Sequence, residues 1–176
     1  MKKVYYWSPC LNKVGTYKST VNSAISLARY SKKKFEIKII NSCGEWNECK
    51  ELFKSNNIEL INFKFNFFNY LPKNGFWSSR FSYLIIILVS IIPLVRLLKK
   101  DKPDFLIMHL LTLLPILFAK FFTNSTKFIL RISGYPKLNF LRKFIWISNS
   151  KNIFKITCPS IDLINQLVDK KIFIKD

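Results

Sequence analysis

Four turns in the sequence hold residues that could do chemistry, and each turn follows a short apolar run. Gly15-Thr16 precede a helical pattern, His109 is the only histidine, Arg131 stands beside Ser133-Gly134, and Thr157–Ser160 form the last turn. Backbone N–H groups at a helix start bind anions, a guanidinium pairs with phosphate, and an imidazole exchanges a proton near neutral pH. If the apolar runs are strands of one parallel sheet, these turns meet at its carboxyl edge, where ligands bind.

Each of these residues also has a structural explanation. His109 taken alone fits a buried core or capping histidine as well as a catalytic one, although its place at the end of a strand favours function. The glycine loop could be an ordinary flexible loop, and Arg131 could stand on an exposed strand end. Gly134 is expected either to let the backbone approach a ligand closely or to adopt positive φ. Cys158 has no base nearby in the sequence, which argues against a nucleophile.

Several common catalytic motifs are absent from the sequence. The glycine loop matches neither the GxxxxGK[ST] phosphate-binding loop nor the three-glycine dinucleotide fingerprint, and there is no G-x-S-x-G. The four cysteines form no CxxC pair and only one histidine is present, so zinc ligands at usable spacing are lacking. We therefore expect no metal and no cofactor. The apolar run after Met1 is too short for a signal-peptide core, so free thiols in a reducing cytoplasm are expected.

Strand-length apolar runs alternate with helical patterns along the chain, which at 176 residues has the size of one domain. This alternation predicts an α/β fold, a Rossmann-like doubly wound parallel sheet with helices on both faces. Ser160 is expected to cap the last helix. The expected strands are Val4–Ser8, Phe35–Ile40, Ile58–Phe63, Phe105–Met108, Phe128–Ile132, Ile153–Thr157 and Ile172–Ile174. The first expected helix begins near Thr16–Ser19, and the others cover Glu45–Lys54, Phe81–Leu98, Leu113–Phe122, Leu138–Ile147 and Ser160–Val168.

The middle of the chain departs from this alternation. Asn62–Ser79 is rich in aromatic residues and is broken by a proline and a glycine, which predicts a long loop or a broken helix. Phe81–Leu98 is almost wholly apolar and long enough to cross a bilayer. Pro93 and Arg96 lie inside it, however, and the alternating pattern resumes after it, so a buried or interfacial helix is favoured over a true span.

The formal net charge of +19 suggests nucleic acid or anionic lipid as a partner. Only five of the 29 basic residues are arginine, the residue that nucleic-acid readers favour for bidentate contacts, and no nucleic-acid-binding motif is present. We therefore expect no nucleic acid and favour an anionic membrane surface. Phe67, Phe68 and Trp77 are the expected membrane contacts, because aromatic rings seat at the level of lipid headgroups.

Three stretches resemble the N-terminal domain of glycosyltransferase family 4, whose members have the two-domain GT-B fold. VYYWSPCLNKVGTYKSTVNSAISLAR is similar to the family's first strand and opening loop, with Gly15-Thr16 where Gly-Gly is usual. KKDKPDFLIMH, which ends at His109, is similar to its KPD strand. KFILRISGYP and KITCPSIDLINQL resemble its fifth strand and its last strand-to-helix junction. Many relatives have His-Gly where this sequence has Ser133-Gly134, which argues against an acid-base role there.

The resemblance implies a retaining, metal-independent transferase that moves a sugar from a nucleotide-sugar donor to a glycan or lipid-linked acceptor in cell-surface polysaccharide or lipopolysaccharide synthesis. Residues 1–176 would form its acceptor-binding domain, inactive without a donor-binding C-terminal domain or partner subunit. Gly15 and Thr16 would border the cleft near the donor phosphates, and Arg131 could pair with an acceptor phosphate. His109, the catalytic candidate, and Ser133-Gly134 would line the acceptor side. The expected location is cytoplasmic, on the inner face of the cytoplasmic membrane.

Two other interpretations stay open at the level of the sequence. The chain could be a non-catalytic, membrane-associated binding subunit or a fragment of a split transferase. It could also be a membrane protein anchored by a single span at Phe81–Leu98.

Overall fold

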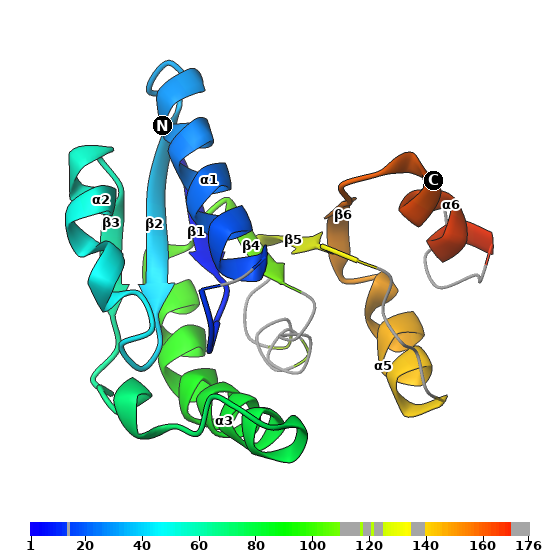
Figure 1. The fold of residues 1–176 in the computed structure, drawn as a ribbon. Coiled ribbons are helices and arrows are strands. Elements are labelled where there is room, and N and C mark those ends of the chain that lie inside the picture. Colours follow the sequence, from blue (N-terminus) through cyan, green and yellow to red (C-terminus); the bar gives the residue numbers. More distant parts are fainter. Residues whose placement is uncertain (14, 110–116, 118–120, 122–124, 135–139, 170–176) are drawn as a thin grey trace.

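Six parallel strands form one sheet in the order β3-β2-β1-β4-β5-β6 (Figure 1). The computed structural model of the chain describes residues 1–13, 15–109, 117, 121, 125–134 and 140–169. The order runs outward in both directions from the neighbouring strands β1 and β4, which confirms the doubly wound α/β prediction. The strands are β1 (Lys2–Trp7), β2 (Phe35–Asn41), β3 (Glu59–Asn62), β4 (Phe105–His109), β5 (Lys127–Arg131) and β6 (Ile153–Thr157).

Helices cover both faces of the sheet, and each face has its own apolar core. Because successive residues of a strand point to opposite faces, Tyr5 and Trp7 enter the core shared with α3, α5 and α6, while Val4 and Tyr6 enter the core shared with α1 and α2. The helices are α1 (Gly15–Tyr30), α2 (Lys50–Ser55), α3 (Phe76–Asp101), α5 (Phe140–Ser150) and α6 (Ile161–Asp169), with short 3-10 helices η1 (Asn47–Cys49) and η2 (Phe68–Tyr70).

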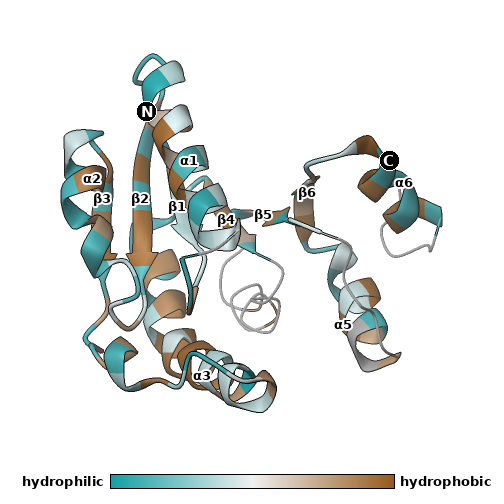
Figure 2. Cartoon of the chain, viewed as in Figure 1, coloured by the Kyte–Doolittle hydropathy of each residue, from teal (hydrophilic) through white to brown (hydrophobic). Residues whose placement is uncertain are grey.

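Helix α3 is longer than predicted, because it begins at Phe76 rather than Phe81 and ends at Asp101 rather than Leu98. One side packs on the domain through buried residues such as Ile86 and Leu94. The other side is exposed and apolar, and Figure 2 shows hydrophobic residues over much of the helix. By length and composition this is the one helix of the described residues that could cross a membrane, and a third of its most apolar window is buried. Of the aromatic segment predicted at Asn62–Ser79, residues 63–75 form a loop that contains η2, as predicted, whereas Phe76–Ser79 belong to α3.

The helix predicted at Glu45–Lys54 is partly wrong. Residues 42–46 form a turn, η1 follows, and α2 starts only at Lys50. The turn replaces helix because the buried carboxylate of Glu45 accepts hydrogen bonds from the N–H groups of Ser42 (2.9 Å) and Cys43 (2.8 Å). By contrast, the Ser160 cap is confirmed, since its Oγ accepts a hydrogen bond from the N–H of Leu163 at 3.3 Å. The strand predicted at 172–174 and most of the helix predicted at 113–122 lie outside the described residues.

Candidate functional site

A cavity of about 500 Å³ lies between α1 and the carboxyl halves of β4, β5 and β6. Helix α1 contributes Gly15, Ser19 and Ser23, which are four residues apart and therefore share one face of the helix. These side chains are small, so the sheet beneath stays accessible. The remaining wall comes from Ile107, Ile129, Arg131, Ile132, Ser133, Thr157, Cys158 and Pro159. We call this space the switch-point cavity, because it adjoins β4, where the strand order reverses.

Among the described residues that line the switch-point cavity, Arg131 is the only charged one. It is the last residue of β5, is half-buried, and pairs in register with His109 at the end of β4. Burial lowers the pKa of His109, and the positive charge of Arg131 adds to that effect. Burial raises the pKa of Tyr6, and the same charge opposes that effect. A guanidinium in a partly desolvated cavity attracts an anionic ligand such as a phosphate.

His109 lies at the same edge but behind the cavity wall. Its side chain is 3% exposed, and its Nε2 lies 3.1 Å from Oγ1 of the buried Thr20 on α1. Burial, with a further contribution from Arg131, lowers the pKa of the imidazole from 6.5 to about 4. The ring is therefore neutral at pH 7 and acts there as a hydrogen-bonding group rather than a cation. A second, partly buried pair, Tyr6 Oη and Ser23 Oγ at 3.0 Å, joins β1 to the cavity wall.

The structure brings three of the predicted substrate-binding residues together and leaves the others off the wall. Gly15, Arg131 and Ser133 line the switch-point cavity, whereas Thr16 and Gly134 lie next to lining residues without reaching it. Gly134 does not adopt positive φ, so that alternative is wrong. No described atom lies within 4 Å of where its Cβ would be, so the space at this turn is open.

The predicted membrane contacts differ among themselves in exposure. Phe67 and Phe68 are half-buried and pack on an apolar cluster formed by Leu11, Cys43, Leu71 and Ile86. Trp77 is 77% exposed, at the start of α3. Of the three, only Trp77 presents most of its ring to the surroundings.

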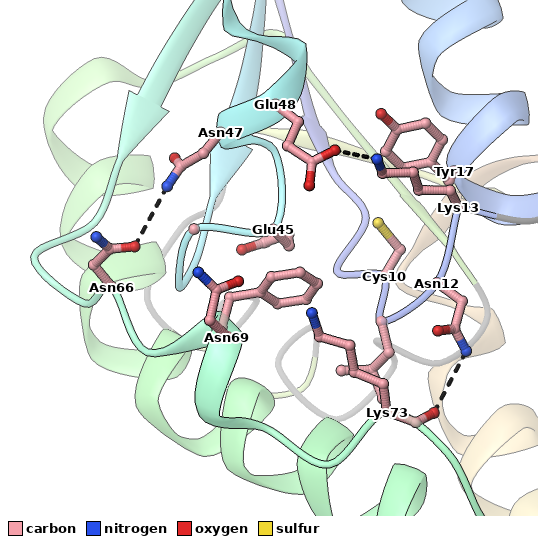
Figure 3. Close-up of a pocket in the computed structure, with 13 residues that line it drawn as sticks. Cys10, Asn12, Lys13, Tyr17, Glu45, Asn47, Glu48, Asn66, Asn69 and Lys73 are labelled. Atoms are coloured by element: carbon pink, nitrogen blue, oxygen red, sulfur yellow. Dashed lines mark hydrogen bonds and ion pairs between the residues drawn. The ribbon is translucent and has the colours of Figure 1, made fainter.

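Sequence reasoning missed a second cavity of about 230 Å³ at the carboxyl ends of β1 and β2 (Figure 3). Its wall includes the asparagines Asn12, Asn47, Asn66 and Asn69, and we call it the amide pocket. The signal available in the sequence was the density of asparagine in the loops after the first three strands. In the part of the chain that the structure describes, no group of three or more His, Cys, Asp or Glu residues could hold a metal ion, and all four cysteines are free thiols.

Comparison with known proteins gives a fold but no family. No family model and no curated protein matches the chain. The fold matches a proposed UDP-N-acetylglucosamine 2-epimerase from Listeria monocytogenes, with a TM-score of 0.59, 10% identity, and coverage of 100% of this chain and 43% of that one. It also matches the calicheamicin glycosyltransferase CalG4, with a TM-score of 0.55, 14% identity, and coverage of 97% and 41%.

A third match is UDP-GlcNAc 2-epimerase from Neisseria meningitidis bound to UDP-GlcNAc, with a TM-score of 0.51, 14% identity, and coverage of 97% and 43%. These proteins have the GT-B fold, so the chain has the fold of one half of a GT-B protein. It spans less than half the length of each of the three.

Proposed function

We propose that the chain is the acceptor-binding half of a glycosyltransferase that uses a nucleotide-sugar donor. The observation that carries the proposal is the switch-point cavity, where Gly15 at a helix start, Arg131 and Ser133 meet in a half-GT-B fold. That fold is shared with proteins whose names include a glycosyltransferase and an epimerase bound to UDP-GlcNAc. Membership of glycosyltransferase family 4, with retention at the anomeric carbon and no metal, is part of the same proposal.

The residues of the cavity suggest a division of roles. Gly15 and Thr16 begin α1, so their N–H groups face the donor phosphates, and Arg131 pairs with an acceptor phosphate. Ser133 and Gly134 form the acceptor side. His109 is neutral at pH 7 and supplies a hydrogen bond to the reacting hydroxyl, for which its ring has to reach past Thr20. A donor-binding domain, in the same protein or in a partner subunit, completes the enzyme.

Location on the inner face of the cytoplasmic membrane is a further part of the proposal, and exposed residues of α3 support it. Trp77, Phe81, Leu84, Leu88 and Ile92 follow one another at helical spacing and are all exposed, with Phe76 beside them. We call these six residues the α3 stripe. The stripe is flanked by exposed basic residues, namely Arg80, whose guanidinium lies 3.6 Å from the centroid of the Phe76 ring, and Arg96, Lys99 and Lys100.

An apolar stripe with basic flanks is typical of a helix that lies in the plane of an anionic bilayer. The test is co-sedimentation of the chain with vesicles of phosphatidylglycerol and phosphatidylcholine. Replacing Trp77, Phe81 and Leu88 with serine should abolish binding. A matched control replaces Tyr30 and Ile161, which are equally exposed but lie on other helices. Binding that survives in the stripe variant, or that is lost in the control, contradicts the proposed orientation.

Transfer itself is tested with membranes from cells that express the chain together with its donor-binding domain or partner subunit, supplied with radiolabelled UDP-, GDP- and dTDP-sugars. Label should enter a lipid or glycan fraction only when the chain is present. His109→Gln should lower that rate by about 100-fold, the usual contribution of a positioned proton-transfer or hydrogen-bonding group. Absence of chain-dependent label with every donor would contradict the transferase role. Full activity of His109→Gln would contradict the role of the histidine.

A second candidate function is epimerisation of a nucleotide-sugar, because three of the structures with similar folds are named UDP-GlcNAc 2-epimerases. The same incubations distinguish the two, since an epimerase converts UDP-GlcNAc to its 2-epimer without an acceptor. A chain that binds acceptor but gives neither product is the non-catalytic subunit.

A further inference from the structure

The amide pocket and the switch-point cavity share no lining residue in the part of the chain that the structure describes. Three segments and one helical residue build it: Cys10–Lys13 after β1, Gly44–Glu48 after β2, Asn66–Lys73 before α3, and Tyr17 of α1. In Figure 3 the labelled side chains surround the space from these segments and from α1, which contributes Tyr17. The pocket therefore gathers residues far apart in the sequence, as ligand sites do.

Amide side chains dominate its rim. Asn47 Nδ2 donates to Asn66 Oδ1 at 3.3 Å, and Asn47 Oδ1 accepts from Asn41 Nδ2 at 2.7 Å, so two of the amides are held in orientation. Among the described residues, the side-chain amide of Asn69 has no hydrogen-bond partner, and that of Asn66 is bonded only through its oxygen. Each amide offers both a donor and an acceptor, which matches hydroxyl groups, since these also donate and accept.

The charges in the pocket balance rather than favour an ion. Lys13 forms an ion pair with Glu48, and the ammonium of Lys73 lies 4.2 Å from the centroid of the Phe68 ring. The carboxylate of Glu45, deeper in the pocket, accepts the two backbone hydrogen bonds of the β2 turn. An anion meets two carboxylates here and a cation meets two ammonium groups, so a neutral polar ligand fits best.

The pocket is also preorganised. Gly44 has φ +105°, and a Cβ there would stand 2.5 Å from Asn66 Oδ1, so the glycine is what allows this amide to approach the β2 turn. The N–H groups of Gly44 and Trp46 donate to Asn41 Oδ1 at 3.2 and 3.0 Å, which holds the turn from below. Aromatic rings of Phe68 and Tyr17 supply apolar surface beside the amides, and Tyr17 is itself stacked on Trp46.

From this combination of amides, balanced charge and aromatic surface, we propose that the amide pocket binds a neutral sugar ring of a glycolipid acceptor. The volume of about 230 Å³ suits a single ring rather than a long glycan. The lipid is expected beneath the α3 stripe, because Lys73 at the pocket rim is followed within three residues by Phe76, where the stripe begins. The acceptor role rests on the proposed function, whereas sugar binding by the pocket does not.

Saturation-transfer NMR on the full chain tests the site without any turnover. The probes are methyl glucoside, N-acetylglucosamine, galactose and lactose as neutral sugars, with glucuronic acid as the charged comparison. Wild type should transfer saturation to at least one neutral sugar and more weakly to glucuronic acid. The double variant Asn66→Ala/Asn69→Ala should weaken binding at least about tenfold, equivalent to about 1.4 kcal/mol. Asn165→Ala, an exposed asparagine on α6, is the matched control and should bind like wild type.

Two results overturn the site. One is the absence of a signal from every neutral sugar, and the other is a signal of equal strength in wild type and in the Asn66/Asn69 variant. Both asparagines are exposed, so the variant should fold, and far-UV circular dichroism checks this. Neutral-sugar binding together with failed transfer from every nucleotide-sugar would keep the pocket and remove the proposed function. Sugar transfer without neutral-sugar binding would keep the proposed function and remove the proposed role of the amide pocket.

Discussion

The switch-point cavity and the amide pocket lie at the same edge of the sheet but are built in different ways. The first is larger, about 500 Å³ against 230 Å³, and its described wall combines aliphatic and small residues with the cation Arg131. The second has a rim of amides around a hydrogen-bonded turn. The comparison teaches that the amide pocket is preorganised by its own side chains. The described residues of the switch-point cavity instead offer space and the charge of Arg131.

The two regions also bury opposite kinds of ionisable group. His109 lies behind the cavity, and burial lowers its pKa. Glu45 lies in the floor of the amide pocket, and burial raises its pKa despite the backbone hydrogen bonds that oppose the change. Both groups are shifted toward the neutral form, because a buried charge is costly. The pH dependence of the free energy of unfolding can therefore probe each site separately, and so can removal of the side chains whose hydrogen bonds build it.

The largest expected effect is loss of the turn that forms the amide pocket. The buried Asn41 side chain donates to Asn47 and to Asn62, both at 2.7 Å, and accepts from two backbone N–H groups. Asn41→Ala should lower the free energy of unfolding by about 4 kcal/mol, since four hydrogen bonds are lost at about 1 kcal/mol each. Urea unfolding followed by circular dichroism measures this.

The control for Asn41 is Asn165→Ala, which should change stability by less than about 0.5 kcal/mol. Asn41→Ala should also abolish sugar binding while leaving the switch-point cavity intact. A loss below about 1 kcal/mol would contradict the claim that this side chain organises the pocket.

The next effect is the pH dependence that His109 gives to stability. Its pKa is about 4 in the folded chain and 6.5 ordinarily, so the unfolded chain binds more protons between these values. The free energy of unfolding should therefore fall by about 3 kcal/mol from this group as the pH drops from 7 to 4, and stay level below. Urea unfolding at a series of pH values should show a shallower fall for His109→Gln than for wild type.

Glu45 provides the opposite slope as an internal check. A carboxyl whose pKa is raised by burial favours the folded state when protonated, so its contribution decreases as the pH rises above 4.5 toward the raised pKa. The difference between wild type and Glu45→Gln should therefore run in the opposite direction to that of His109→Gln. Parallel slopes for both variants would mean that the two sites are not electrostatically distinct.

The unequal success of sequence reasoning follows the same division. The parallel sheet, His109 at the end of β4 and Arg131 at the end of β5 were predictable, because they depend on local apolar periodicity and on where each strand stops. The amide pocket was not, because the burial of Glu45 and Asn41 and the approach of Asn66 to Gly44 join separate loops. The α3 stripe was missed for a related reason, since a helix that is apolar all round does not reveal which side the sheet covers.

Glycine substitutions give a smaller effect that compares the two sites directly. Gly44→Ala places a Cβ at φ +105° and against Asn66, and should cost about 1–3 kcal/mol as well as weakening sugar binding. Gly134→Ala, beside the switch-point cavity, meets open space and should be within about 0.5 kcal/mol of wild type. Urea unfolding of both variants measures the pair. An equal loss in the free energy of unfolding for both variants would show that the two turns are equally constrained.

The smallest expected effect on stability is at the ion pair of Lys13 and Glu48, where both side chains are largely exposed. The pair raises the pKa of Lys13 and lowers that of Glu48 by a direct hydrogen bond, yet solvent screening leaves exposed pairs with little effect on folding. Glu48→Gln should therefore leave the urea midpoint unchanged. It removes one of two carboxylates from the amide pocket while Lys13 and Lys73 remain, so saturation transfer to glucuronic acid should increase while transfer to the neutral sugars is kept. An unchanged preference would mean that charge balance does not select the ligand of this pocket, and that the amides alone do.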